Sequence, residues 1–143
     1  MLTENLTIYR DTFELCRLMM LYLDSVPRSH RFGEYGRAVS MALDALDMIY
    51  VANSSIEERP AALTRYLQII GGVRSRVRLF TEAKVLSVKR SVTLMALIEK
   101  ISRQATGWRN NSQSQSRQAK VSRENSPYSE DDTGLSLSPH WDK

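Results

Sequence analysis

The sequence predicts an all-α protein: an antiparallel up-down-up-down four-helix bundle over residues 1–109, followed by a disordered tail over residues 110–143. Four stretches carry apolar residues at alternating spacings of three and four, the pattern of one helix face. Short connections join the stretches, which makes sequential helices antiparallel neighbours. After Trp108 the composition changes to Ser, Asn and Gln with two Ser-Pro steps. Such a segment buries too little apolar surface to offset its ordering entropy.

The first helix is expected to begin near Thr3 or Asn5, either of which can cap it, and to end before Pro27. Its apolar face is formed by Leu6, Tyr9, Phe13, Cys16, Met20 and Leu23, with Ile8, Leu15, Met19 and Tyr22 in a flanking stripe. A helix that is apolar over so much of its circumference is covered from two sides, in a bundle or at a subunit interface. The single cysteine, Cys16, is expected to be a small buried apolar residue.

The second helix is expected from about Glu34 to Asn53, with an apolar face of Val39, Leu43, Leu46, Ile49 and Tyr50 and small residues at Ala38, Ala42 and Ala45. The third carries Leu63, Tyr66, Ile70, Val73, Val77 and Phe80 on one face. Gly71 and Gly72 inside it indicate a kink or a close approach of another backbone, and the unbroken apolar phase favours close packing. The fourth helix is capped by Ser87, carries Leu94, Ile98, Ile101 and Ala105, and closes at Trp108.

The residue types of common catalytic and metal sites are missing or wrongly spaced. His30 and His140 are the only histidines, and no Cys or His pair has metal-ligand spacing. Asp44 and Asp47 share a helix face, but a di-iron bundle also needs Glu-x-x-His motifs. We therefore expect no enzyme activity, catalytic residue, metal or cofactor. No window approaches the roughly 18 apolar residues of a membrane span, no secretory signal is visible, and a lone cysteine fits a reducing compartment, so a cytoplasmic location is expected.

Charge is segregated along the chain. Residues 1–58 have a balance of −4, residues 59–109 a balance of +9, and residues 110–143 a balance of −1. A solvated helix surface usually mixes its signs, so the middle segment indicates a polyanion or an acidic protein surface as partner.

The cations expected to contact this partner cluster on the third helix, at the following turn, and in the connection between the first two helices. They are Arg74, Arg78, Lys89, Arg90, Arg76, Lys84, Arg28 and Arg31. Guanidinium groups suit phosphate because they offer forked donors and stay charged. The alternative is that acids of the first two helices, such as Asp44, Asp47 or Glu14, neutralise single arginines.

Several motifs resemble a bacterial four-helix bundle family. They are the connection Val26-Pro27-Arg28-Ser29-His30-Arg31-Phe32-Gly33-Glu34-Tyr35-Gly36, Ala52-Asn53, the repeat Val73-Arg74-x-x-Val77-Arg78-Leu79, and Gly107-Trp108. This family comprises the accessory variability determinant (Avd) proteins of diversity-generating retroelements and the related proteins encoded in 23S rRNA intervening sequences. The resemblance covers about residues 3–110 and does not include the tail.

The resemblance implies a protomer that assembles into a barrel-shaped homopentamer with a basic surface. It also implies binding to the retroelement's reverse transcriptase and to nucleic acid, as template RNA or cDNA, in support of mutagenic retrohoming. Two alternatives stay open from the sequence: a bundle of the rRNA intervening-sequence type, and a scaffold that binds an acidic protein and never contacts nucleic acid.

Overall fold

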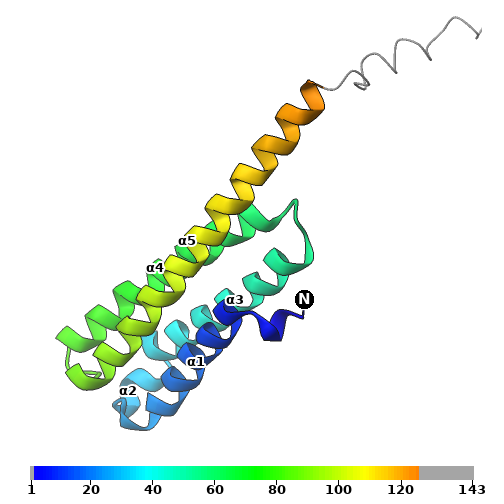
Figure 1. Cartoon of the computed structure of the whole chain (residues 1–143). Helices are drawn as coiled ribbons and strands as arrows, with labels where there is room; N and C mark the ends of the chain where they lie inside the picture. The colour runs from blue at the N-terminus through cyan, green and yellow to red at the C-terminus, as the bar shows by residue number, and fades with distance from the viewer. Residues whose placement is uncertain (1, 126–143) are drawn as a thin grey trace, which may run out of the picture.

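A computed structural model describes residues 2–125 of the chain, and within these residues every regular element is helical. The elements are α1 (Thr7–Leu21), the one-turn α2 (Arg28–Arg31), α3 (Glu34–Ser54), α4 (Arg59–Glu82) and α5 (Val88–Glu124), with 3-10 turns η1 (Thr3–Asn5) and η2 (Tyr22–Ser25). α3 packs on α4, α4 on α5, and α1 on both α3 and α5 (Figure 1). The four long helices thus enclose one hydrophobic core.

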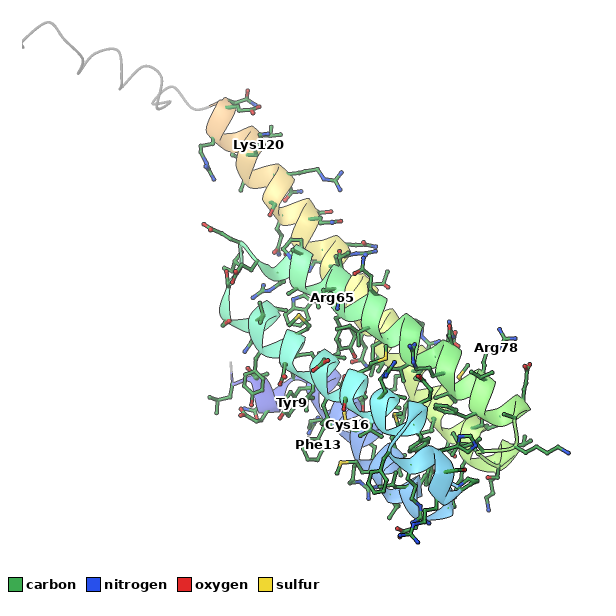
Figure 2. The ribbon with its side chains drawn as sticks, turned by 180° about the vertical axis from the view of Figure 1, so that it is seen from behind. Tyr9, Phe13, Cys16, Arg65, Arg78 and Lys120 are labelled. Carbon is green, nitrogen blue, oxygen red and sulfur yellow. The ribbon has the colours of Figure 1, made fainter. Side chains whose placement is uncertain are left out.

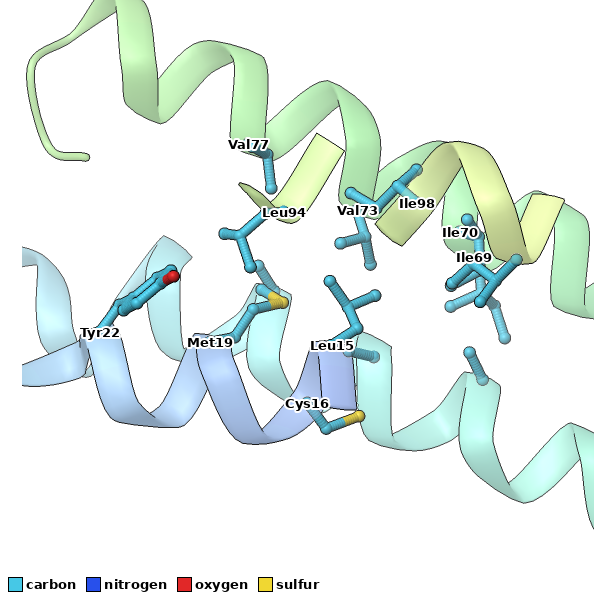
Figure 3. Packing of buried hydrophobic residues seen from close by; sticks show 14 of the residues in the cluster. Leu15, Cys16, Met19, Tyr22, Ile69, Ile70, Val73, Val77, Leu94 and Ile98 are labelled. Atoms are coloured by element: carbon cyan, nitrogen blue, oxygen red, sulfur yellow. The ribbon is translucent and has the colours of Figure 1, made fainter. Parts of the chain in front are cut away.

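The apolar face of α4 is buried as predicted. Leu63, Tyr66, Ile70, Val73, Val77 and Phe80 all lie in the interior. Figure 3 shows Val73 and Val77 of α4 facing the buried side chains of α1, among them Leu15 and Met19. On α5 the predicted positions from Leu94 to Ala105 are buried in the same core. In each of these stretches the buried stripe has the longest run of apolar residues at helical spacing, whereas apolar residues beside it, such as Leu79 on α4 and Val92 on α5, are exposed.

α1 buries its flanking stripe instead of the stripe that contains Phe13 and Met20. Ile8, Leu15 and Met19 are buried, whereas Phe13 is 52% and Met20 56% exposed. Both stripes have helical spacing, and the packing of α1 against α3 and α5 selects the flanking one. Cys16 belongs to the same predicted stripe as Phe13 and Met20 but lies at its edge next to Met19, and it is buried, as predicted.

α3 likewise turns its alanines inward. Ala38, Ala42 and Ala45 are fully buried, whereas Leu43 and Tyr50 are exposed. Alanine faces let helices approach closely, so their burial brings α3 near α4. The predicted apolar face of α3 is therefore wrong for Leu43 and Tyr50, because small residues and not the largest ones line this contact.

Two glycines mark close approaches. A Cβ atom on Gly72 would lie 2.7 Å from the Cε atom of Met41 on α3, in agreement with the predicted close packing of α4. Gly71 has no such neighbour and is exposed. A Cβ atom on Gly36 would lie 2.8 Å from the backbone carbonyl oxygen of Arg31. This clash could be removed only by a shift of the backbone, because the neighbouring atom is not part of a flexible side chain. Gly36 therefore allows α3 to start directly behind α2.

Buried hydroxyl groups tie the helices together. The Thr12 hydroxyl donates to the Ile8 carbonyl at 2.7 Å and lies 2.7 Å from the Tyr66 hydroxyl, which links α1 to α4. The Tyr35 hydroxyl donates to the Met19 carbonyl at 2.7 Å, which links α3 to α1. Burial raises the pKa of both Tyr35 and Tyr66, so these phenols stay neutral.

α5 is longer than predicted. The sequence analysis closes this helix at Trp108, but α5 continues to Glu124. No proline follows within the helix, and Gln, Arg, Lys and Ala support helix formation, so nothing in residues 110–124 stops it. From Ser114 to Asn125 every residue is exposed, and Figure 1 shows this part projecting past the other helices. The rest of the predicted tail, residues 126–143, lies outside the described residues.

Within residues 2–125, none of the helices combines the length and the apolar character that crossing a lipid bilayer demands.

Candidate nucleic-acid interface

The connection between α1 and α3 begins at Val26 and places two of the predicted arginines. Pro27 is extended and ends the preceding 3-10 turn, and the next four residues form α2. The Arg31 guanidinium folds back: its Nε donates to the Val26 carbonyl at 2.9 Å and its Nη2 to the Asp24 carbonyl at 3.0 Å. The Arg28 side chain is exposed. Arg31 is therefore a positioning residue that keeps its charge, and Arg28 is available to a partner.

Two arginines of α4 meet carboxylates from other helices. Arg74 Nη2 lies 2.8 Å from Glu99 Oε2 on α5, and Arg76 Nε lies 3.6 Å from Glu34 Oε2 on α3. Exposed pairs of this kind are worth only about 0–1 kcal/mol. The prediction that Arg74 and Arg76 contact a partner remains untested, but both are partly neutralised within the chain. Arg78, one turn beyond Arg74, is exposed, and Figure 2 shows it at the α4 surface.

The turn between α4 and α5 holds Lys84 in a left-handed conformation, with φ 61°. The turn is closed by the amide of Val85, which donates to the Phe80 carbonyl at 2.7 Å. A non-glycine residue in this conformation costs about 1–2 kcal/mol. Ser87 caps α5 as predicted, because its hydroxyl accepts from the Arg90 amide at 3.2 Å. Lys84 itself is exposed, so the turn presents its charge to solvent.

Arg90 joins this turn to the end of α1. Its guanidinium carbon lies 4.5 Å from the centroid of the Tyr22 ring, and its Nη1 donates to the Ser25 hydroxyl. A cation over a ring face is attracted by about 0.5–1 kcal/mol at exposed sites. Lys89, the preceding residue, is exposed. Through these contacts Arg90 holds the start of α5 against the residues that follow α1.

These two segments form one end of the bundle, which we call the basic end: residues 22–37 and 76–90. Figure 1 shows α2 and the α4–α5 turn at the same end of the molecule. The basic end contains eight Arg and Lys against three acids, Asp24, Glu34 and Glu82. Its exposed cations without an ion pair to a described residue are Arg28, Arg78, Lys84 and Lys89. Arg74 lies outside it, as the sixteenth of the 24 residues of α4.

Several charged or aromatic contacts were missed from the sequence. Arg37 belongs to the basic end and forms an ion pair of 3.3 Å with Glu34. The three-residue spacing of these opposite charges on one helix could have indicated this pair from the sequence. Tyr22 was assigned to an apolar stripe, and only the fold places Arg90 on its ring. The projecting part of α5 adds Arg117 and Lys120, which the disorder prediction had set aside.

The remaining chemistry of the described residues is limited. Between residues 2 and 125, no three His, Cys, Asp or Glu side chains are grouped so that they could hold a metal ion. Burial raises the pKa of the Cys16 thiol from 9.0 to about 11, so its nucleophilic thiolate form is rare at neutral pH. The feature with a clear chemical preference is the basic end, which favours anions.

Comparison of the chain with protein-family models, with curated proteins and with solved structures found no match.

Proposed function

We propose that the basic end binds the phosphate backbone of a nucleic acid and that the protein acts as a binding subunit without catalytic activity. The observation that carries this proposal is a set of four exposed cations that form no ion pair within residues 2–125: Arg28, Arg78, Lys84 and Lys89. They come from two segments that are far apart in the sequence and meet at one end of the fold. Cations gathered in this way repel one another, so an anionic partner relieves the repulsion.

The held arginines support the same function. Arg31 and Arg90 use backbone carbonyls, a hydroxyl and a ring as partners, and none of these neutralises a guanidinium. Their charges therefore add to the field at fixed positions. Arginine and lysine side chains of such a surface bind the phosphate groups of a nucleic acid, and phosphate contacts fix its position without reading its base sequence. A binding mode of low sequence specificity follows.

On the resemblance of residues 3–110 to the Avd proteins, we extend the proposal to an accessory subunit of a reverse transcriptase in a diversity-generating retroelement. Its ligands are then template RNA or cDNA, and its fold an up-down-up-down bundle that assembles as a homopentamer in the cytoplasm. The exposed apolar side chains Phe13 and Met20 of α1 and Leu43 and Tyr50 of α3 support assembly. Tyr9 packs against both Phe13 and Tyr50, so these two side chains belong to one surface.

The test of phosphate binding is the double variant R78Q/K84Q, which removes two exposed charges of the basic end. The matched control is R10Q/R65Q, because both residues are exposed cations outside the basic end, and Figure 2 shows Arg65 and Arg78 well apart on α4. Binding of labelled duplex DNA is measured by fluorescence anisotropy across a salt series. Loss of two phosphate contacts lowers the slope of log K against log salt by about 1.8.

We expect R78Q/K84Q to bind roughly tenfold or more weakly at 0.1 M salt, and R10Q/R65Q to bind almost as the unmodified chain does. Equal losses in both variants would mean that net charge, and not the basic end, decides binding. Affinity that does not change with salt in the unmodified chain would refute phosphate neutralisation itself.

The extension to a reverse transcriptase is tested separately. Co-purification with the polymerase encoded beside this gene, after nuclease treatment, is expected, together with paired template and variable repeats at the locus. A coding sequence inside a 23S rRNA gene would favour the intervening-sequence type instead. Recovery of an acidic protein, with no binding of RNA or DNA, would favour a scaffold.

A further inference from the structure

The outer face of α5 connects the basic end to the projecting part of the helix. α5 has 37 residues, and residues 114–124, which we call the arm, extend past the other helices without packing on them. Figure 2 shows Lys120 on the arm, at the opposite end of the molecule from Arg78. A straight helix of this length spans about 55 Å. One element therefore reaches from the basic end to beyond the bundle.

Three cations recur on this helix at a step of 14 residues: Lys89, Arg103 and Arg117. A step of 14 residues turns an α-helix through about 1400°, only about 40° short of four full turns. The three side chains therefore share one side of α5, at intervals of about 21 Å. All three are exposed and form no ion pair with a described residue. We call them the α5 line.

The side chains exposed along the α5 line would allow a polar partner to lie close to the helix. From Ala96 to Arg117 the exposed residues of α5 are all small, polar or charged. Gly107 lies about 1800°, or five full turns, beyond Lys89 and is therefore on the same side of the helix. Because glycine has no side chain, this position leaves room for a ligand. Protein–protein interfaces generally need an apolar core, and the exposed large apolar side chains beside the line, Val88 and Val92, are confined to its Lys89 end. A nucleic acid, which carries charge along its whole length, fits it better.

The arm adds a reason for an anionic partner. Arg117, Lys120 and Arg123 follow one another at spacings of three, and like charges at this spacing destabilise a helix. The arm has no packing to compensate, and unpacked helices of this length are marginal in water. A phosphate beside Arg117 would relieve part of this repulsion.

We propose that a nucleic-acid duplex lies along α5, with its phosphates contacting the α5 line from Lys89 at the basic end to Arg117 on the arm. This inference rests on the proposed function and adds to it the form and minimum length of the ligand. Lys89 and Arg117 are 28 residues apart, about 42 Å along the helix. At 3.4 Å per base pair this span corresponds to roughly 12 base pairs. A shorter duplex cannot reach all three cations.

The test compares 8-bp and 16-bp DNA duplexes with the full chain, the variant R103Q/R117Q, and the control R10Q/R65Q. The control removes the same charge from α1 and α4, away from the line. Binding is measured by fluorescence anisotropy at 0.1 M salt, and far-UV circular dichroism checks that each variant is folded. The expected gain from 8 to 16 bp is roughly tenfold for the full chain and the control, because an 8-bp duplex, about 27 Å long, reaches only two of the three cations and the longer duplex adds the third phosphate contact.

R103Q/R117Q is expected to lose this gain and to bind 16 bp about as weakly as 8 bp, with a salt slope lower by about 1.8. Trypsin cleavage after Arg117 in the full chain is expected to slow with the 16-bp duplex and not with the 8-bp duplex.

Retention of the length gain by R103Q/R117Q would overturn the α5 line while leaving the basic end in place. A 16-nucleotide single strand that binds as tightly as the 16-bp duplex would overturn the duplex assignment. Polyglutamate of matched charge that competes as well as the duplex would overturn nucleic acid as the partner. Failure of the full chain to bind either duplex would overturn the proposed function as well, so the two failures are distinguishable.

Discussion

Replacing Arg31 by alanine should destabilise the protein, although the residue was predicted from the sequence to contact a partner. Its guanidinium donates hydrogen bonds of 2.9 and 3.0 Å to the carbonyls of Val26 and Asp24. Hydrogen bonds from a charged donor contribute about 1.5–3 kcal/mol each. Arg31 is half-buried, and water can replace part of what is lost. The expected cost of R31A is therefore about 2 kcal/mol in the free energy of unfolding.

Arg28 provides the matched control, because it lies on the same short helix and carries the same charge but is exposed. R28A should change the free energy of unfolding by no more than about 0.5 kcal/mol. Both variants remove one charge from the basic end, so both should lower the affinity for duplex DNA to a similar degree. The pair of variants separates the structural contribution of an arginine from its electrostatic one.

The assay is urea denaturation followed by circular dichroism at 222 nm. With a slope of about 1–3 kcal/mol per molar urea, the expected cost moves the R31A midpoint down by about 1 M and leaves the R28A midpoint almost unchanged. Coinciding midpoints for the two variants would refute the argument that Arg31 holds the connection between α1 and α3. A change in slope for R31A would mean that the native or the unfolded state had changed in compactness.

Three further outcomes follow from burial and packing. Because burial raises the pKa of Cys16 from 9.0 to about 11, alkylation by iodoacetamide at pH 8 should be about a hundredfold slower in the native protein than in urea; equal rates would contradict this. G36A should cost about 1–3 kcal/mol because its Cβ meets a backbone carbonyl, whereas G71A meets nothing and should stabilise by up to about 1 kcal/mol, both measured by urea denaturation. Burial raises the pKa of Tyr35 and Tyr66, so the native state holds protons that the unfolded chain releases above about pH 10. The free energy of unfolding, measured by urea denaturation, should therefore be lower at pH 10.5 than at pH 8. Equal values at the two pH values would contradict this prediction.

Local patterns predicted α4 and α5 well because one apolar stripe in each is longer and more regular than the apolar residues beside it. The buried residues from Leu63 to Phe80 and from Leu94 to Ala105 follow directly from spacing, and so does the cap at Ser87. α1 has two apolar stripes of equal period, so spacing could not tell that Ile8 and not Phe13 faces the core. The continuation of α5 was missed because a polar composition was taken as disorder, although no residue before Glu124 stops the helix.

The candidate site shows a similar division. The excess of cations over residues 59–109 is a property of the sequence, and it alone indicated an anionic partner. The partners of single arginines depend on residues far away along the chain: Arg74 meets Glu99 from 25 positions further on, and Arg90 meets Ser25 from 65 positions back. No local pattern contains such pairs.

The amino-acid sequence by itself determined where helices form, which stripe of α4 is buried and the sign of the surface, because periodicity and charge are local quantities. Only the tertiary structure decided which cations stay free. Arg31 and Arg90 are held in place by hydrogen bonds, and Arg74 and Arg76 meet carboxylates. The four cations of the basic end that have no ion pair within residues 2–125 face solvent: Arg28, Arg78, Lys84 and Lys89. The physical reason is that pairing depends on distances between side chains on different helices, which are set when those helices pack.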